Sequence, residues 1–258
     1  MKRYTMMTQK NILRSYFSII IGFLLICLLG CEKDENDDQD NEFCPSTFKD
    51  YRDGQEYKAV KIFRQCWMAE NLNIGTKINS TQSGRQQQDN GTIDKYCYDN
   101  DVANCEIYGG LYEWREAMQY VYTEGTQGIC PTGWHIPTDG ELNTLTIYLG
   151  GSSVAGGKMK STGTIEAGTG LWHDPNSGAT NESGFSGLPG GDRYGYSGSF
   201  GDLGNYGYFW SSSHSSTDNS RGRFLNYNST NVHGNDVWSA DGFSVRCLMD
   251  TLDQSKGY

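Results

Sequence analysis

The chain has 258 residues and a net charge of −10, and 36% of its residues are hydrophobic and 13% aromatic, so one domain with a hydrophobic core is feasible. Residues 1–30 contain four basic residues and no acid, which leaves 21 − 4 = 17 basic against 31 acidic residues, a charge of −14, in the remainder. This balance argues against nucleic acid as a partner, because nucleic-acid binding needs a basic surface.

The amino terminus has the pattern of a signal peptide. A basic segment precedes an apolar run at residues 19–29, which is short for a membrane-spanning helix. The run ends in LLGC at residues 28–31, which resembles the lipobox of bacterial lipoproteins and implies acylation of Cys31. The alternative is an uncleaved anchor with an incidental cysteine, but the short run and Gly30 favour a lipoprotein signal peptide over residues 1–30.

Residues 31–42 are predicted to form a disordered acidic tether. Charged and amide side chains dominate the segment, and such a composition cannot bury enough apolar surface to fold. An acidic stretch behind an acylated cysteine also resembles the surface-export signal of Bacteroidetes lipoproteins. That resemblance implies an outer-membrane lipoprotein facing the cell exterior, and the alternative is a spacer on a lipoprotein that faces the periplasm.

Six cysteines remain beyond the predicted signal peptide and its lipidation site. An even number in an exported chain predicts three disulfides, although six cysteines allow fifteen pairings. Spacing favours one pair across a short polar loop, one across the carboxy-terminal half, and a third pair from the two that remain. In that order the pairs are Cys97 with Cys105, Cys130 with Cys247, and Cys44 with Cys66. No CxxC motif is present, so a zinc module is not predicted.

The first half of the domain predicts a hairpin, a polar excursion and one helix. Residues 57–63 alternate in character and predict a strand, which turns back into a second strand at 66–68. Residues 79–100 are polar and predict a surface excursion with a short strand at 95–98. The apolar spacing of Leu111, Trp114 and Met118, continued by Val121 or Tyr122, predicts a helix.

A second helix has clearer boundary signals. Thr138 and Glu141 form a capping-box pattern, and Leu142, Leu145 and Leu149 follow at helical spacing. A glycine pair at 150–151 predicts the end of this helix.

Residues 183–213 are rich in glycine, tyrosine and serine. Glycine at every third position from 195 to 207 first suggests collagen, but no proline follows Pro189, so that interpretation is rejected. The segment predicts a long irregular loop that either binds a ligand or packs as an insertion. Short strands are predicted at 207–212, 223–227 and 243–248.

The order of several short motifs resembles a known family. The motifs are DG at 53–54, YKAVKI at 57–62, WMAENL at 67–72, YGGLYEW at 108–114, CPTGWHIPT at 130–138, GF at 184–185, LPGG at 188–191, FWSS at 209–212 and GFSVRC at 242–247. Together they resemble the Fibrobacter succinogenes major paralogous domain family across nearly the whole mature chain.

The resemblance implies an exported, often lipid-anchored protein of Bacteroidetes or Fibrobacteres and a fold similar to C-type lectins and formylglycine-generating enzymes. It implies no established activity and no catalytic residues. We therefore expect a C-type-lectin-like α+β domain over residues 43–250, with two helices and loop-rich, disulfide-bonded antiparallel sheets, and a tail at 251–258.

A calcium site is one candidate feature of the loop that Cys97 and Cys105 would close. Asp99, Asn100, Asp101 and Asn104 carry the hard oxygen ligands that calcium prefers. Their spacing does not match an EF-hand, and Asx-rich segments also form ordinary turns. No other cofactor is predicted.

Saccharide binding is the sharpest functional hypothesis. Trp172, Trp210 and Trp238 lie in the loop-rich half among polar residues, so stacking faces and hydrogen-bonding groups can coincide there. Trp210 belongs to the FWSS motif and is expected to be buried. Trp172 and Trp238 are expected to be more exposed.

The sequence favours a binding module over an enzyme. The motifs G-x-S-x-G and H-E-x-x-H and the phosphate-binding glycine loops are absent, and His135 is expected to make a structural hydrogen bond. Formylglycine-type chemistry would need free thiols, whereas disulfides explain the mature cysteines. We predict a surface lipoprotein that binds an extracellular glycan or protein, with a structural or adhesin-type surface component as the alternative.

Overall fold

The computed structural model describes residues 43–251, and within them the chain is mostly β-sheet with four short α-helices. This confirms the α+β class in its coarse form. The predicted signal peptide, the lipidation site Cys31, the acidic tether and all but the first residue of the carboxy-terminal tail lie outside the described residues. No helix within 43–251 has the length and hydropathy needed to span a membrane.

One sheet has five antiparallel strands and contains the predicted hairpin. Its strand order is β1 (Thr47–Lys49), β2 (Glu56–Ile62), β3 (Gln65–Met68), β14 (Leu248–Met249) and β7 (Trp134–His135). Strands β2 and β3 are joined by a tight turn at Phe63 and Arg64, as the sequence predicts. The two edge strands approach each other, because the rings of Phe48 in β1 and Trp134 in β7 stack with centroids 4.3 Å apart.

A second sheet has seven strands, and all of them except β6 come from the carboxy-terminal half of the chain. Its order is β12 (Val232–Trp238), β11 (Asn219–Asn226), β10 (Tyr206–His214), β8 (Gly190–Tyr194), β13 (Gly242–Phe243) and β6 (Tyr112–Glu113), with β9 (Ser199–Leu203) paired to β8. All pairings are antiparallel except that of β8 with β10.

The prediction of a long irregular loop at 183–213 is wrong. Strands β8 and β9 form a hairpin there, and β10 follows directly. Some of the glycines serve close packing within this sheet rather than loop flexibility: a Cβ on Gly207 would lie 2.4 Å from the carbonyl oxygen of Leu188, and one on Gly191 2.3 Å from that of Gly201.

The single strand predicted at 243–248 is divided between the two sheets. Residues 242–243 form β13 in the seven-stranded sheet, and residues 248–249 form β14 in the five-stranded sheet. Ser244 and Arg246 are buried, as are Phe243, Val245 and Cys247. Both faces of the segment are covered because it crosses between the two sheets.

Of the two predicted helices, one is confirmed and the other is shortened. α4 (Asp139–Tyr148) begins with the predicted capping box, in which Thr138 Oγ1 accepts from the Glu141 N–H at 3.2 Å and Glu141 Oε2 accepts from the Thr138 N–H at 2.8 Å. The predicted helix around Leu111–Tyr122 is reduced to α3 (Trp114–Ala117). Residues 112–113 pair with β13 instead, so sheet pairing overrides the helical spacing.

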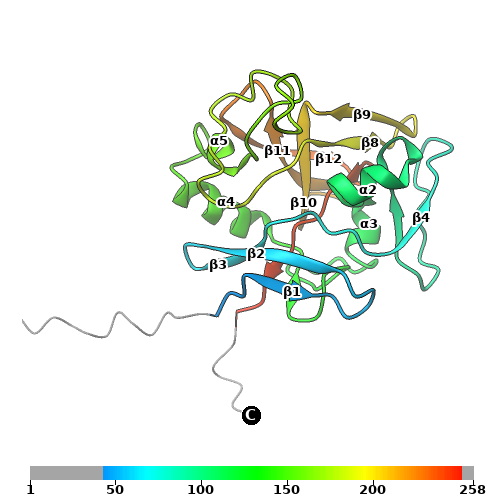
Figure 1. Cartoon of the computed structure of the whole chain (residues 1–258). Coiled ribbons are helices and arrows are strands. Elements are labelled where there is room, and N and C mark those ends of the chain that lie inside the picture. Colours follow the sequence, from blue (N-terminus) through cyan, green and yellow to red (C-terminus); the bar gives the residue numbers. More distant parts are fainter. Residues whose placement is uncertain (1–42, 252–258) are drawn as a thin grey trace, which may run out of the picture. The chain divides into compact units, whose positions relative to one another are not determined.

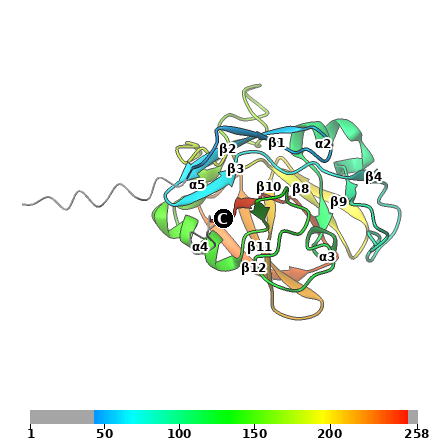
Figure 2. The same cartoon turned by 90° about the horizontal axis from the view of Figure 1, so that it is seen from below.

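Smaller elements fill the rest of the first half. Strands β4 (Thr76–Ile78) and β5 (Asp94–Tyr96) pair in parallel, and β5 overlaps the short strand predicted at 95–98. A 3-10 turn at Tyr98–Asn100 leads into α2 (Val102–Tyr108), and α5 (Ala155–Met159) follows α4; neither helix was predicted. In Figure 1 and Figure 2, α4 and α5 lie on one side of β10 and β11, and α2 and α3 lie on the other.

The three favoured disulfides are all present. They join Cys44 to Cys66, Cys97 to Cys105 and Cys130 to Cys247, with sequence separations of 22, 8 and 117 residues. Two clusters of buried side chains form the core. One contains Trp114, Trp210 and the Cys130 to Cys247 disulfide, and the other lies beneath α4 and contains Trp172.

Candidate binding site

The three candidate tryptophans differ in burial: Trp172 and Trp210 are buried, and Trp238 is half-buried. The expectation that Trp172 is exposed is wrong, because its side chain is 0% exposed and its indole N–H donates to Ser161 Oγ and Gly187 O, both at 3.1 Å. Trp210 is buried as expected, and it donates to Tyr112 O at 2.7 Å. Neither indole can meet a ligand, since the surrounding core covers both rings.

Trp238 is half-buried at the end of β12 and has charged neighbours. The guanidinium of Arg85 lies over its indole, 5.9 Å from the ring centroid, and that of Arg115 lies over the ring of Tyr122 at the same distance. Both arginines approach Asp218. We call these five residues the Trp238 cluster.

A single carboxylate joins the two arginines of the cluster. Asp218 Oδ1 lies 3.2 Å from Arg85 Nη2 and 3.8 Å from Arg115 Nη2. The Asp218 side chain is 63% exposed. The Nε atoms of Arg85 and Arg115 are both buried and have no hydrogen-bond partner. The two arginines thus share one carboxylate, and their Nε donors remain without an acceptor.

Four segments of the chain bring the cluster together. Asp218 lies in the connection between β10 and β11, and its carbonyl accepts from the Ser239 N–H at 2.8 Å. In the register of β11 with β12, Asn219 pairs with Trp238, so the backbone of Asp218 lies opposite Ser239, the residue that follows Trp238. Arg115 belongs to α3, and Arg85 belongs to the polar excursion.

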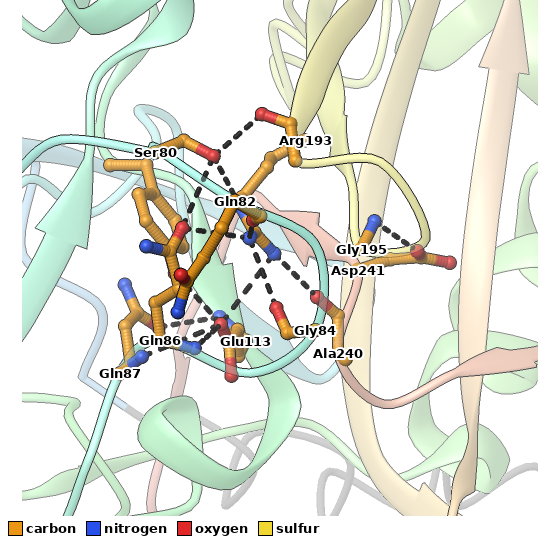
Figure 3. Close-up of polar contacts among 12 residues, drawn as sticks. Ser80, Gln82, Gly84, Gln86, Gln87, Glu113, Arg193, Gly195, Ala240 and Asp241 are labelled. Carbon is orange, nitrogen blue, oxygen red and sulfur yellow. Dashed lines mark hydrogen bonds and ion pairs between the residues drawn. The ribbon is translucent and has the colours of Figure 1, made fainter.

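A buried arginine, Arg193, supports this arrangement from β8 (Figure 3). Its guanidinium lies over the ring of Tyr96 at 4.6 Å and donates to five oxygens. The acceptors are Ser80 Oγ at 2.8 Å, Gln82 O at 2.9 Å, Gly84 O at 3.0 Å, Gln86 Oε1 at 2.9 Å and Ala240 O at 3.1 Å. The polar excursion is thereby fastened to the sheet.

Glu113 is the acidic partner within this buried network. Its Oε1 accepts from the Gln86 N–H and the Tyr96 hydroxyl, both at 2.8 Å, and lies 3.6 Å from Arg193 Nη1. Burial raises the pKa of the Glu113 carboxyl, although these hydrogen bonds and the charge of Arg193 oppose the rise.

The buried network fixes the backbone close to Arg85, Arg115 and Trp238. Gly84 and Gln86, which flank Arg85, both contact Arg193, and the Gly84 N–H donates to Gly195 O at 2.7 Å. Glu113 lies two residues before Arg115, and Ala240 lies two residues after Trp238. An arrangement supported in this way is preorganised, because its backbone is fixed by the buried network.

The four candidate calcium ligands are used in local turns. Asp101 caps α2 by accepting from the Ala103 N–H at 3.0 Å, and Asn100 Oδ1 accepts from the Ser80 N–H at 2.7 Å. Asn104 donates to Tyr98 O at 2.9 Å, and Asp99 adopts a positive φ of 53°. Within residues 43–251, no group of three His, Cys, Asp or Glu side chains is arranged to hold a metal ion.

His135 lies at a hollow of about 260 Å³ between β7, β3 and α4. Its Nδ1 is 2.6 Å from Asp250 Oδ1 and its Nε2 is 3.2 Å from Glu141 Oε1. Burial lowers the pKa of the imidazole, but these two hydrogen bonds outweigh burial and the net pKa is raised. Because both ring nitrogens are engaged, His135 has the structural hydrogen bonds that the sequence predicts.

An exposed aromatic pair marks a second surface. Phe63, at the tip of the β2–β3 turn, stacks on Tyr148 of α4 with centroids 4.9 Å apart, although the two side chains are 48% and 54% exposed. Phe63 also has a φ of 57°, which is unusual for a bulky residue. A hollow of about 300 Å³ lies beside the pair, with Lys158 and Glu182 at its rim.

Comparison with known proteins identifies the family. The family model of the Fibrobacter succinogenes major domain matches residues 60–249. The chain belongs to this family. No curated protein and no solved structure is significantly similar to it.

The arginines of this Fibrobacter succinogenes major domain were not predicted as site residues. Arg85 is the one cation in a glutamine-rich loop, and Arg115 lies in a segment predicted as helix. Their shared carboxylate is about a hundred residues or more away, with separations of 133 residues for Arg85 and 102 residues between Arg115 and the adjacent Thr217. Local sequence carries no signal for such a long-range meeting.

Proposed function

We propose that the protein is a lipid-anchored, surface-exposed binding module without catalytic activity, and that its ligand is an extracellular saccharide bound at the Trp238 cluster. The half-buried Trp238, flanked by polar groups on a buried, hydrogen-bonded support, carries this proposal. Saccharide sites combine an aromatic face with converging hydrogen-bonding groups, and both occur here.

A C-type-lectin-like fold is part of the same proposal. The family resemblance implies it, and one feature supports it: a disulfide between Cys130 and Cys247 closes the carboxy-terminal half, which contributes Trp238 and Asp218 to the candidate site. The absence of catalysis is supported by the pairing of six cysteines in disulfides, which removes the thiols that formylglycine-type chemistry would need.

A protein-binding or adhesin-type role is the second candidate, favoured by one observation. Phe63, Ile147 and Tyr148 expose apolar surface together at the tip of the β2–β3 turn and the end of α4. Exposed apolar surface of this kind is typical of interaction sites between proteins.

A glycan-array screen of the full-length chain tests the saccharide proposal. We expect binding that Trp238→Ala abolishes, because the stacking face is removed, and that Tyr196→Ala preserves. Tyr196 is a matched control, since it is an aromatic residue that is 75% exposed and whose ring lies beside that of Tyr194. Absence of binding to every glycan, or equal binding by both variants, would contradict the proposal and favour a protein partner.

A further inference from the structure

The Trp238 cluster concentrates positive charge in an acidic protein. The whole chain has a net charge of −10, yet two guanidinium groups converge here on one point. Their like charges repel, so the arrangement requires an anion between them. In the structure that anion is the carboxylate of Asp218.

The Asp218 carboxylate is an imperfect partner for the two arginines. It meets Arg85 through one oxygen at 3.2 Å, lies 3.8 Å from Arg115, and leaves both Nε donors without an acceptor. A guanidinium binds a carboxylate best through two parallel hydrogen bonds. The hairpin connection constrains Asp218 through the bond from the Ser239 N–H to its carbonyl, whereas a ligand carboxylate is free to take the bidentate position.

The aromatic residues of the cluster orient both guanidiniums. Arg85 lies over Trp238 and Arg115 over Tyr122, and both guanidiniums turn their Nη2 atoms toward the position of the Asp218 carboxylate. Trp238 is half-buried, so part of its side chain is open to a sugar ring. The cluster therefore offers a position for a carboxylate next to a surface for a pyranose ring.

We propose that the cluster binds an acidic saccharide, with a uronic acid carboxylate held by Arg85 and Arg115, and that Asp218 occupies the carboxylate position when no ligand is bound. This inference rests on the proposed saccharide-binding function and specifies its ligand class. Asp218 competes with the ligand, so it sets the affinity of the site.

Titration calorimetry of the full-length chain with uronic acid oligosaccharides tests the inference. The probes are oligogalacturonate, alginate and hyaluronan oligosaccharides, each compared with its carboxyl-reduced, neutral counterpart. We expect the preferred acidic probe to bind about tenfold or more tightly than its neutral counterpart, since the charge-assisted bonds are lost on reduction.

Variants of the cluster separate the roles of its residues. Arg85→Gln and Arg115→Gln should each weaken acidic binding about tenfold and neutral binding by much less, so the preference for the acidic probe falls, whereas Asp218→Asn should tighten acidic binding severalfold. Arg221→Gln is the matched control, because Arg221 is an exposed arginine of β11 that pairs with Asp236 outside the cluster, and its acidic binding should stay within about twofold of the parent.

The outcomes distinguish this inference from the proposed function. Equal binding of acidic and neutral probes that still depends on Trp238 would overturn the carboxylate assignment and leave saccharide binding intact. Tighter binding of dextran sulfate than of every uronic acid probe would also overturn it. Loss of stability without tighter binding in Asp218→Asn would show that the ion pairs are only structural, and absence of any saccharide binding would overturn both proposals.

Discussion

Three cations of the domain are fully buried, and backbone carbonyls supply most of their partners. Among residues 43–251, Arg193 lies within ion-pair distance of one carboxylate, that of Glu113, whereas Arg246 and Lys160 have no carboxylate at such a distance. Arg246 donates to the carbonyls of Phe185 and Ser186, and Lys160 donates to those of Asn226 and Ser229.

Burial of these groups changes their acid–base behaviour. Desolvation lowers the pKa of Lys160 to about 8 and that of Arg246 to about 9. Irregular segments leave carbonyls without partners from regular structure, and one buried cation can satisfy several of them. The buried cations therefore fix the irregular segments in place by binding their backbone carbonyls.

Replacement of Arg193 by methionine tests whether a buried cation stabilises the fold. Methionine retains an apolar stem but has no donors, so Glu113 and five oxygen acceptors would lose their partner. We expect Arg193→Met to lower the free energy of unfolding by about 3–5 kcal/mol, the range for breaking a buried pair from one side. Urea denaturation followed by tryptophan fluorescence measures the loss.

An exposed ion pair provides the comparison for Arg193. Arg221 lies 3.3 Å from Asp236, and both side chains are more than two-fifths exposed. Arg221→Met should change the free energy of unfolding by less than about 1 kcal/mol. Equal losses in the two variants would contradict a special role for the buried arginine.

At the scale of an element, α4 illustrates how local signals and packing agree. Its capping box satisfies free N–H groups at the amino-terminal end, and Leu142 and Leu145 bury the inner face against the second core cluster. α3 lacks such a side-chain cap, and it ends after one turn. Helix length here follows from whether the first turn is stabilised and whether the preceding residues join a sheet.

Thr138→Ala tests the contribution of the cap to α4. The change removes the acceptor of the Glu141 N–H and should lower the free energy of unfolding by about 1 kcal/mol. Thr144→Ala is the matched control, because Thr144 is an exposed threonine inside the same helix whose hydroxyl donates only to Gly140 O. Alanine favours helix interiors, so this control should be neutral or slightly stabilising in thermal denaturation, and a loss equal to that of Thr138→Ala would contradict the capping role.

At the scale of the whole described domain, two sheets and long connections are closed by disulfides. Cys130 and Cys247 join segments 117 residues apart and belong to the first core cluster, whereas Cys97 and Cys105 close a loop of 8 residues. A longer loop has more conformational freedom in the unfolded chain, so its closure stabilises the folded state more.

Paired alanine substitutions test this difference. Chain entropy gives about 5 kcal/mol for loss of the Cys130 to Cys247 disulfide and about 2.5 kcal/mol for loss of the Cys97 to Cys105 disulfide. Denaturant unfolding of the two double variants should therefore rank them in this order. The reverse order would mean that loop closure does not dominate the contribution of these bonds.

Tertiary contacts also explain which predictions failed. The apolar spacing from Leu111 onward predicts a helix, but residues 112–113 pair with β13, a partner 130 positions later in the chain. The glycine-rich segment at 183–213 predicts a loop, yet its glycines allow close contact between strands. In both cases the deciding neighbour is distant in sequence, and local patterns contain no information about it.

The amino-acid sequence by itself determined the family, the coarse α+β class, the hairpin of β2 and β3, helix α4 and the three disulfides. These features depend on local chemistry, such as a capping pair, a turn or cysteine spacing, or on the order of motifs along the chain. Only the tertiary structure decided three other features: the burial of Trp172, the hydrogen bonds of Arg193, and the proximity of Arg85 and Arg115 to Asp218. The physical reason is that burial and charge pairing depend on which distant segments the sheets bring together.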